Sequence, residues 1–197
     1  MRDAYSSRSQ QYIDLFDGDW DANEVDAAFI QRHLGASRGP VLGLGCGPGY
    51  WTEYLHRLGA HVTGVDVVPE FIAHARARHQ GPDFRLGSMS DAGSPEHSVS
   101  GVLSWYSTIH VPPQELDAVL ADFRRLIAPS GTLVLGYFDS DGEVAAFDHA
   151  IITAYRWPAD LLVQRLVQAG FAEVERVQRQ IASRPDRKYA AVAATAV

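Results

Sequence analysis

A glycine-rich segment at residues 41–49, with the sequence V-L-G-L-G-C-G-P-G, restricts the possible folds of this chain more than any other feature. It starts with an apolar run typical of a buried parallel strand, and the glycines that follow let the backbone approach a bound ligand closely. Asp66 comes about twenty residues later, at the end of a second predicted strand, where a carboxylate accepts hydrogen bonds from ribose hydroxyls. The pattern therefore predicts a nucleotide-like ligand at the carboxyl ends of two parallel strands.

Strand and helix patterns alternate along the rest of the chain, which predicts an α/β fold with a mostly parallel sheet and helices on both faces. The predicted strands are residues 41–45, 61–65, 84–86, 99–104, 132–138, 171–181 and 188–196, the last two forming a hairpin. The predicted helices are residues 3–35, 50–58, 70–79, 114–127 and 159–169, and residues 129–131 form a turn. A length of 197 residues fits one domain over residues 1–197.

Charge and composition argue against several classes of function. The chain has 17 basic and 24 acidic residues, a net charge of −7, so its average surface repels a nucleic-acid backbone. Cys46 is the single cysteine, which rules out an intramolecular disulfide and suits a reducing compartment. Without a signal peptide pattern or an apolar run of about 18 residues, we expect a cytoplasmic protein that does not enter the membrane.

No metal site is expected, because neither of two histidine pairs has the spacing of metal ligands that share a helix face. The pairs are His56 with His61 and His74 with His79, each five residues apart.

Two nucleotide-like ligands compete for the glycine loop. Dehydrogenases that bind NAD(P) use G-x-G-x-x-G and place a pyrophosphate at the helix N-terminus. Here the spacing is G-x-G-x-G with Pro48 inside it. S-adenosylmethionine has no phosphates and needs ribose, adenine and amino-acid contacts instead, so this loop favours it. An NAD(P)-dependent oxidoreductase is the rival interpretation.

Further motifs extend over nearly the whole chain. They are V-T-G-V-D at residues 62–66, G-S-M at 87–89, S-W-Y-S-T-I-H at 104–110, P-S-G-T-L-V-L-G-Y-F at 129–138 and A-Y-R-W-P at 154–158. With the glycine loop, they make the chain resemble the class I S-adenosylmethionine-dependent methyltransferases, particularly the small bacterial methyltransferase-domain group. The resemblance implies a Rossmann-like fold with a seven-stranded sheet, and S-adenosyl-L-methionine as the cofactor. It also implies a helical lid at residues 1–35 over a core at residues 41–197.

The resemblance also assigns the residues that contact the cofactor. They are Gly45, Cys46, Gly47 and Gly49 around the methionine part, Asp66 on both ribose hydroxyls, Val67, Gly87, Ser88 and Met89 beside the adenine, Ser104 and Trp105 on the methionine side, Trp51 and Thr52 at the start of the following helix, and Tyr12 from the lid. The family usually has an acidic residue at the position of Gly43, which helps to hold the cofactor ammonium. Backbone carbonyls near Gly45 and Ser104 are candidates to replace it.

His110 is the first candidate catalytic base, because it lies just beyond the fourth predicted strand on the loop facing the ligand, and an ordinary histidine titrates near neutrality. The alternative is a histidine that is bonded to a backbone carbonyl or caps the next turn. Tyr106, on the same loop, is a candidate to orient the substrate or to assist His110. The alternative is that its ring only packs against neighbouring residues. Tyr5 and Trp20 are candidate walls of the substrate pocket. Arg156 suits a substrate carboxylate or a surface ion pair.

These residues and the resemblance predict methyl transfer to a small molecule, most simply an aromatic or heteroaromatic one. Carbon C3 of the indole in a tryptophan-derived cyclic dipeptide is one candidate acceptor, since a Tyr/His pair suits an indole N–H. No nucleic acid or membrane partner is expected, and the acceptor atom and the oligomeric state stay open. The alternative is a non-catalytic module that binds S-adenosylmethionine and acts through a partner.

Overall fold

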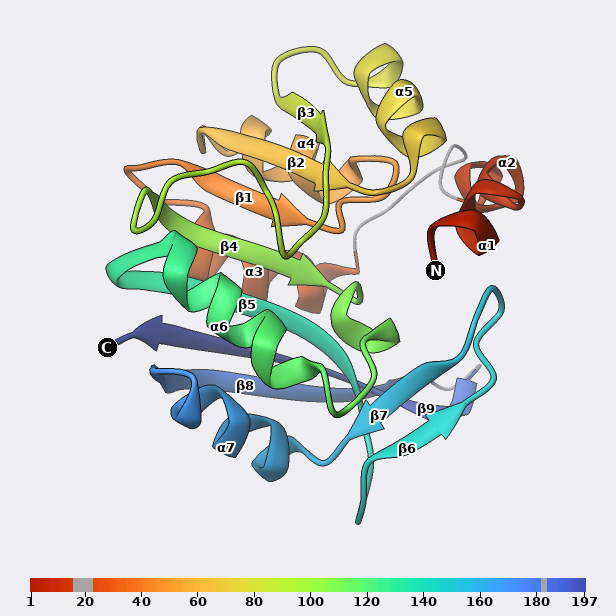
Figure 1. Cartoon of the computed structure of the whole chain (residues 1–197), viewed down its shortest axis with the longest axis vertical. Helices are drawn as coiled ribbons and strands as arrows, with labels where there is room; N and C mark the ends of the chain where they lie inside the picture. Colours follow the sequence, from red (N-terminus) through yellow and green to blue (C-terminus); the bar gives the residue numbers. More distant parts are fainter. Residues whose placement is uncertain (16–22, 182–183) are drawn as a thin grey trace.

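The computed structural model of the protein describes residues 1–15, 23–181 and 184–197, in which helices cover both faces of one mixed sheet (Figure 1). The helices are α1 (Arg2–Ser6), α2 (Ser9–Asp14), α3 (Glu24–Leu34), α4 (Tyr50–Arg57), α5 (Pro69–Arg78), α6 (Leu116–Leu126) and α7 (Ala159–Gln168), with a short 3-10 helix η1 (Thr108–His110). The strands are β1 (Val41–Leu44), β2 (Val62–Asp66), β3 (Asp83–Leu86), β4 (Val99–Trp105), β5 (Ile127–Asp139), β6 (Ala145–Phe147), β7 (Ala154–Trp157), β8 (Phe171–Ile181) and β9 (Arg184–Ala196). The predicted α/β class is confirmed.

The parallel part of the sheet has the order β3-β2-β1-β4-β5. The antiparallel strand β9 pairs with the other edge of β5, and β8 pairs with β9. Beyond the end of β4, β5 also pairs in parallel with β7, and β6 continues that edge as the partner of β7. The strand order reverses between β1 and β4, so the carboxyl ends of these strands form the edge where α/β folds bind ligands.

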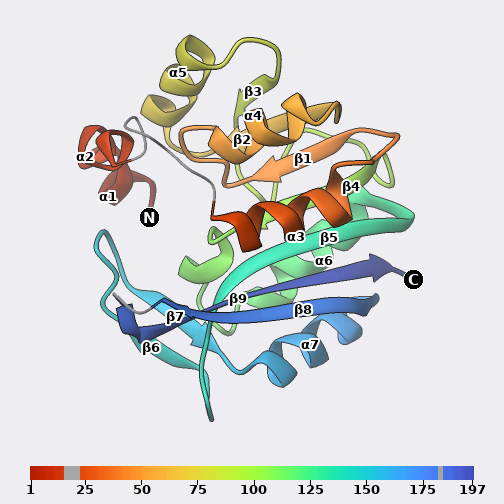
Figure 2. The same cartoon turned by 180° about the vertical axis from the view of Figure 1, so that it is seen from behind.

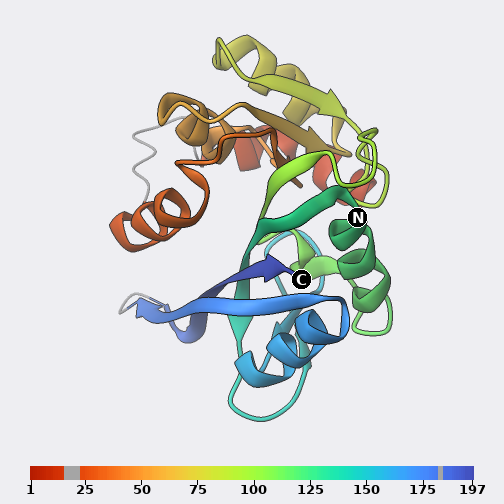
Figure 3. The same ribbon diagram turned by 90° about the vertical axis from the view of Figure 1, so that its left-hand side faces the viewer.

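Apolar side chains on both faces of the sheet hold the helices in place. On one face, α3 and α4 pack through Phe29, Ile30 and Leu55 onto residues of β1, β4, β5 and β9. On the opposite face, α6 and α7 pack through residues such as Phe123 and Leu162 (Figures 1 and 2). Burial of each such side chain stabilises the fold by about 1.5–3 kcal/mol. Figure 3 shows the sheet between α3 on one side and α6 and α7 on the other.

Three features of the chain differ from the prediction. The sheet has nine described strands instead of seven, because the hairpin of β6 and β7 was not expected. These strands are three and four residues long, too short for a periodic pattern, and their position depends on pairing with the end of β5. The predicted turn at residues 129–131 lies inside β5 as a bulge, where the register moves from Val99↔Ile127 to Gly101↔Thr132 and Ser130 has φ 64°.

The third difference concerns the N-terminal segment, which forms three helices instead of one helical stretch. Helices α1 and α2 lie beside α5 and the connection between β6 and β7 (Figure 1). The Ser6 hydroxyl donates to Glu70 Oε2 at 2.5 Å, and Arg8 Nη1 donates to the carbonyl of Ala150 at 2.7 Å. Ile13 packs with Phe71 in a small apolar cluster. The N-terminal helices therefore bridge two parts of the edge that carries the carboxyl ends of the strands.

Within residues 1–15, 23–181 and 184–197, no helix is long and apolar enough to cross a membrane.

Candidate active site

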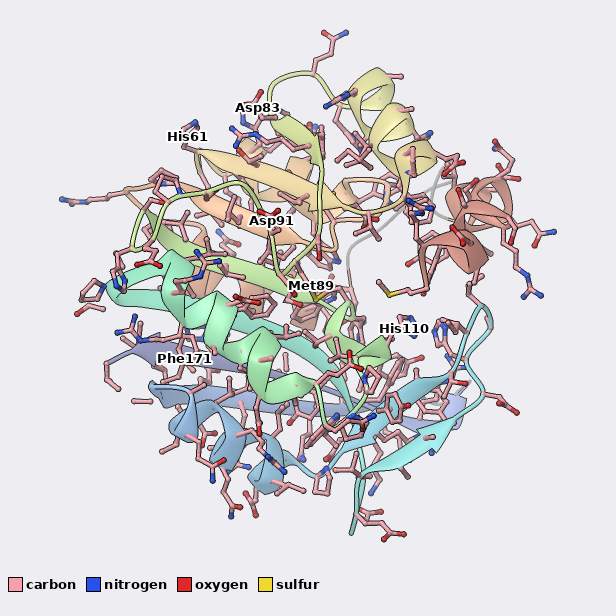
Figure 4. The ribbon with its side chains drawn as sticks, viewed as in Figure 1. His61, Asp83, Met89, Asp91, His110 and Phe171 are labelled. Atoms are coloured by element: carbon pink, nitrogen blue, oxygen red, sulfur yellow. The ribbon has the colours of Figure 1, made fainter. Side chains whose placement is uncertain are left out.

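The larger of two adjoining cavities, of about 430 Å³, lies at the carboxyl ends of β1, β2, β3 and β4. Twelve residues predicted for the site line this cavity: Tyr5, Tyr12, Gly45, Gly47, Asp66, Val67, Gly87, Ser88, Met89, Trp105, Tyr106 and His110. They come from α1, from α2 and from the ends of four parallel strands. Figure 4 shows Met89 on the loop after β3 and His110 nearer to the N-terminal helices and the β6–β7 connection.

Asp66 is fixed at the centre of this edge by backbone hydrogen bonds. Its Oδ2 accepts the N–H of Gly47 at 2.8 Å, and its Oδ1 accepts the N–H of Val68 at 2.9 Å. Burial raises the pKa of Asp66 above its usual value, while these backbone N–H groups oppose the rise. Each carboxylate oxygen keeps a further lone pair. The arrangement leaves Asp66 able to accept hydrogen bonds from a pair of ligand hydroxyls.

The glycine loop is held against β4 by two serines. A Cβ atom on Gly45 would lie 2.3 Å from Ser107 Cβ, and Gly45 has φ +72°, so a side chain there would meet both a clash and backbone strain. Ser107 Oγ donates to the Leu44 carbonyl at 2.7 Å and lies 2.6 Å from Ser104 Oγ. Ser104 is completely buried and lines neither of the two cavities. Its side chain therefore contacts Ser107 and not the space where a ligand would lie.

His79 holds the same loop in place through a hydrogen bond to its backbone. Its Nε2 donates to the Pro48 carbonyl at 3.1 Å, which assigns the hydrogen of the neutral ring to Nε2. Burial lowers the pKa of His79, so the ring is neutral at pH 7. The sequence singled out His79 only as an unsuitable metal ligand, and nothing in its spacing indicates this support.

The second cavity, of about 260 Å³, adjoins the first at the glycine loop. Five residues line both cavities: Tyr12, Gly45, Gly47, Trp105 and Tyr106. The predicted residues Cys46, Trp51 and Thr52 line the smaller cavity alone. Its aromatic wall is continuous, since ring centroids are 5.6 Å apart between Trp51 and Trp105 and 5.4 Å apart between Trp105 and Tyr106. Burial raises the pKa of the Cys46 thiol well above its usual value, which argues against a nucleophile.

Asn23 and Asp26 also line the smaller cavity and were not predicted. The signal that could have found them is the cap of α3, because Asn23 Oδ1 accepts the N–H groups of Val25 and Asp26 at 3.1 and 3.4 Å. An asparagine followed three residues later by an acidic residue is a common helix start.

Tyr5 and His110 meet at the rim of the larger cavity. Tyr5 Oη lies 2.7 Å from His110 Nε2, and His110 Nδ1 lies 2.9 Å from the Thr153 carbonyl oxygen. Since a carbonyl only accepts, Nδ1 donates to it, and the neutral ring therefore accepts the Tyr5 hydroxyl at Nε2. Burial lowers the pKa of His110 and raises that of Tyr5, so both groups are uncharged at pH 7.

Of the other predicted residues, three line neither cavity, and a fourth lies outside the described residues. Gly49 caps α4 behind the glycine loop, and Ser104 is buried beneath it. The Arg156 guanidinium lies over the Phe147 ring, with 4.4 Å from Cζ to the centroid, on the β6–β7 hairpin. Trp20 lies outside the described residues.

Elsewhere, a cavity at the amino ends of the strands includes His61 and Asp83, at the opposite end of the sheet from His110 (Figure 4). In the described ranges, no group of three histidine, cysteine or acidic side chains is placed to hold a metal ion.

Comparisons with known proteins agree with this geometry. A family profile described as a methyltransferase domain matches residues 41–131. A protein named ubiquinone biosynthesis O-methyltransferase, from Xanthomonas oryzae pv. oryzae, is 31% identical over 137 residues, which cover 67% of this chain and 56% of that protein. The chain thus spans little more than half the length of the curated relatives it matches.

Two solved structures have a similar fold. The 1,6-didemethyltoxoflavin-N1-methyltransferase of Burkholderia thailandensis, with bound 1,6-didemethyltoxoflavin and S-adenosylhomocysteine, aligns with a TM-score of 0.82 and 25% identity over 100% of this chain and 87% of its own. Magnesium protoporphyrin IX methyltransferase of Synechocystis PCC 6803 with bound S-adenosylmethionine aligns with a TM-score of 0.75 and 18% identity, over 100% and 95%. At 18% identity, the similarity to the second structure shows a shared fold alone.

The glycine loop with Asp66, the strand order and these similarities place the chain in the class I S-adenosylmethionine-dependent methyltransferase family. The family's cofactor is S-adenosyl-L-methionine and its product is S-adenosyl-L-homocysteine. The residues present fit this cofactor, because the buried carboxylate of Asp66 lines the larger cavity and the glycine loop lines both this cavity and the adjoining one.

Proposed function

We propose that the protein transfers a methyl group from S-adenosyl-L-methionine to a small aromatic or heteroaromatic acceptor that carries an ionisable N–H or O–H. The observation that carries the proposal is the chain of hydrogen bonds from Tyr5 through His110 to the Thr153 carbonyl at the rim of the larger cavity. A neutral histidine that accepts a tyrosine hydroxyl at Nε2 is suited to take up a proton relayed through that hydroxyl.

In this proposal the ends of β1, β2 and β3 hold the cofactor. Asp66 would accept both ribose hydroxyls, Val67 and Met89 would contact the adenine, and Gly45 and Gly47 would pass beneath the sulfur toward the smaller cavity. When bound, the cofactor supplies a methyl group that its positively charged sulfur already activates. The first task of the protein is therefore positioning, which recovers up to about 7–11 kcal/mol of a barrier in well-oriented reactions.

Tyr5 and His110 then manage the proton that the acceptor loses. The acceptor N–H or O–H donates to Tyr5 Oη, and its proton moves to that oxygen as the Tyr5 hydroxyl proton moves to His110 Nε2. The histidine becomes an imidazolium whose Nδ1–H remains bonded to the Thr153 carbonyl. The raised pKa of Tyr5 means that its phenol is neutral before and after the transfer. Tyr106 would orient the acceptor ring from the cavity wall.

The proposed class of acceptor follows from the walls of the cavity. Trp105, Tyr106 and Phe71 offer aromatic faces or edges, and stacking on such rings favours flat acceptors. The Burkholderia enzyme acts on 1,6-didemethyltoxoflavin, a heteroaromatic compound, which supports the same class here. Within that class, indole C3 of a tryptophan-derived cyclic dipeptide stays a candidate, since its N–H could donate to Tyr5. Arg156 stays a candidate contact for an acceptor carboxylate from the hairpin.

We further propose that α1 and α2 act as a lid, whereas α3, which belonged to the lid expected at residues 1–35, packs on the face of the sheet. Tyr5 belongs to α1, and Tyr12, which lines both cavities, belongs to α2. With these helices in place, Tyr5 contacts His110, and the lid would exclude water from the acceptor; opening it would admit cofactor and acceptor.

The test is turnover of an acceptor panel by the protein and by two variants. The panel contains phenols, N–H heteroaromatic compounds such as 1,6-didemethyltoxoflavin, and tryptophan-derived cyclic dipeptides, with methylated product and S-adenosylhomocysteine measured by mass spectrometry. His110→Ala should lower kcat by about 10²-fold or more while leaving cofactor affinity near the wild-type value. Tyr5→Phe should lower kcat by a similar factor if the proton passes through Tyr5. His61→Ala, at the opposite end of the sheet, is the matched control.

Two outcomes would contradict the proposal. Unchanged turnover in His110→Ala removes this histidine from the reaction. Tight cofactor binding with no product from any acceptor favours a binding module that acts through a partner.

A further inference from the structure

Asp26 is a buried carboxylate on the wall of the smaller cavity that the mechanism above does not use. It lies in the first turn of α3 and is 6% exposed, whereas the neighbouring Glu24 is exposed. The Asn23 cap fixes this end of the helix. The carboxylate therefore has a defined position facing the same space as Gly45 and Thr52.

Arg179 of β8 holds the carboxylate from outside the cavity wall. Arg179 Nε donates to Asp26 Oδ1 at 2.8 Å, and Nη2 donates to Oδ2 at 2.5 Å. Its Cζ lies 4.8 Å from the centroid of the Tyr189 ring, which further fixes the guanidinium. A bidentate arginine uses one lone pair on each oxygen, so each oxygen can accept one more hydrogen bond.

The family cofactor has a positive charge that needs such a partner. Its amino-acid tail ends in an ammonium and a carboxylate, on the far side of the sulfur from the ribose. A ligand with its ribose at Asp66 reaches the smaller cavity across Gly45 and Gly47, because these residues line both cavities. Burying an ammonium without an anionic partner is strongly unfavourable.

Asp26 is the one carboxylate among the described residues that line the smaller cavity. Gly43 lines the same cavity but offers no side chain, and Thr52 Oγ1 lies 3.0 Å from where its Cβ would be, so the space for an acidic side chain at that position is partly taken. We propose that Asp26 accepts a hydrogen bond from the ammonium of the cofactor's amino-acid tail. The inference concerns the cofactor alone and holds for any acceptor.

The test measures calorimetric affinities of three ligands for the full chain. The ligands are S-adenosylhomocysteine, its analogue with hydrogen in place of the amino group, and 5′-methylthioadenosine, which lacks the whole tail. The wild-type protein should bind S-adenosylhomocysteine about 10- to 100-fold more tightly than the desamino analogue, the range expected for a charge-assisted hydrogen bond. Asp26→Asn should lose most of this preference and bind 5′-methylthioadenosine as the wild type does.

Arg179→Met separates binding from a structural role, since it removes the same ion pair but leaves the Asp26 carboxylate. The proposal expects Arg179→Met to keep the preference for the amino group. If Asp26 only ties α3 to β8, the two variants should lose affinity for all three ligands alike, and the proposal is overturned. It is also overturned if Asp26→Asn discriminates between S-adenosylhomocysteine and the desamino analogue as strongly as the wild type does. The latter comparison is made within one variant, so reduced stability does not obscure it.

Discussion

The two halves of the candidate site are built in different ways. The cofactor half rests on β1, the glycine loop and β2, a continuous stretch in which Asp66 accepts the N–H of Gly47, 19 residues earlier. The acceptor half joins segments far apart in the chain, since 105 residues separate Tyr5 from His110 and 142 separate Arg8 from Ala150. The first half is therefore encoded locally, and the second depends on how distant elements dock. Substitutions in each half should have separable effects.

The largest effect is expected in the cofactor half, from Asp66→Ala. The change removes the acceptor for the Gly47 and Val68 N–H groups and for both ribose hydroxyls of the cofactor. Hydrogen bonds to a charged group are worth about 1.5–3 kcal/mol each, so the Kd for S-adenosylhomocysteine should rise by at least about 100-fold. Calorimetry measures this change, with Asp83→Ala at the amino ends of the strands as the control.

A weakened Asp66→Ala protein must also be shown to be folded, because two buried N–H groups lose their partner and each costs about 1–3 kcal/mol. Urea unfolding monitors this loss. An unchanged Kd in a folded variant would mean that the ribose lies elsewhere.

This contrast explains what the sequence could predict. The glycine loop and Asp66 combine a local spacing with an apolar strand pattern, and both lie where expected. The β6–β7 hairpin carries no such pattern, because its short strands depend on the end of β5 for partners. The pairing of Asp26 with Arg179 spans 153 residues and requires the final position of β8. Ser104 belongs to a recognised motif, yet its contact with Ser107 depends on how tightly the loop packs.

The two halves should also differ in how they respond to pH. Burial lowers the pKa of His79 under the glycine loop, and it lowers the pKa of His149, near His110, to about 4. Below the ordinary pKa of about 6.5, the unfolded chain binds protons that these folded histidines do not, so the free energy of unfolding rises with pH up to that value. Each histidine contributes at most about 1.4 kcal/mol per pH unit, and less where solvent reaches it.

Asp66 changes the free energy of unfolding in the opposite direction. Burial raises its pKa, so just above pH 3.8 the folded carboxyl keeps a proton that the unfolded chain loses. The contribution of Asp66 to the free energy of unfolding therefore falls as the pH rises through that range. Urea unfolding between pH 5 and 7.5 should show the rise due to the histidines. His149→Phe should make the slope shallower by removing one of the two contributions of the acceptor half, the other being that of His110, and His79→Phe should remove the contribution of the cofactor half. If neither substitution changes the slope, these histidines do not cause the rise of the unfolding free energy with pH.

The smallest effect is expected from Arg8→Ala, which tests whether the two halves are independent. Arg8 Nη1 donates to the Ala150 carbonyl and so ties the N-terminal helices to the connection that also provides the Thr153 carbonyl for His110. Because this bond is exposed, its loss should cost about 0.5–1.5 kcal/mol and raise the acceptor KM by about 2- to 10-fold. The Kd for 5′-methylthioadenosine should stay the same, since Asp66 and the glycine loop keep their contacts. Arg2→Ala, which removes an arginine of the same helical segment whose side chain pairs with the exposed Asp3, is the matched control. Equal losses of acceptor and cofactor affinity in Arg8→Ala would mean that the helices close over both halves as one unit, through Tyr12 as well as Tyr5.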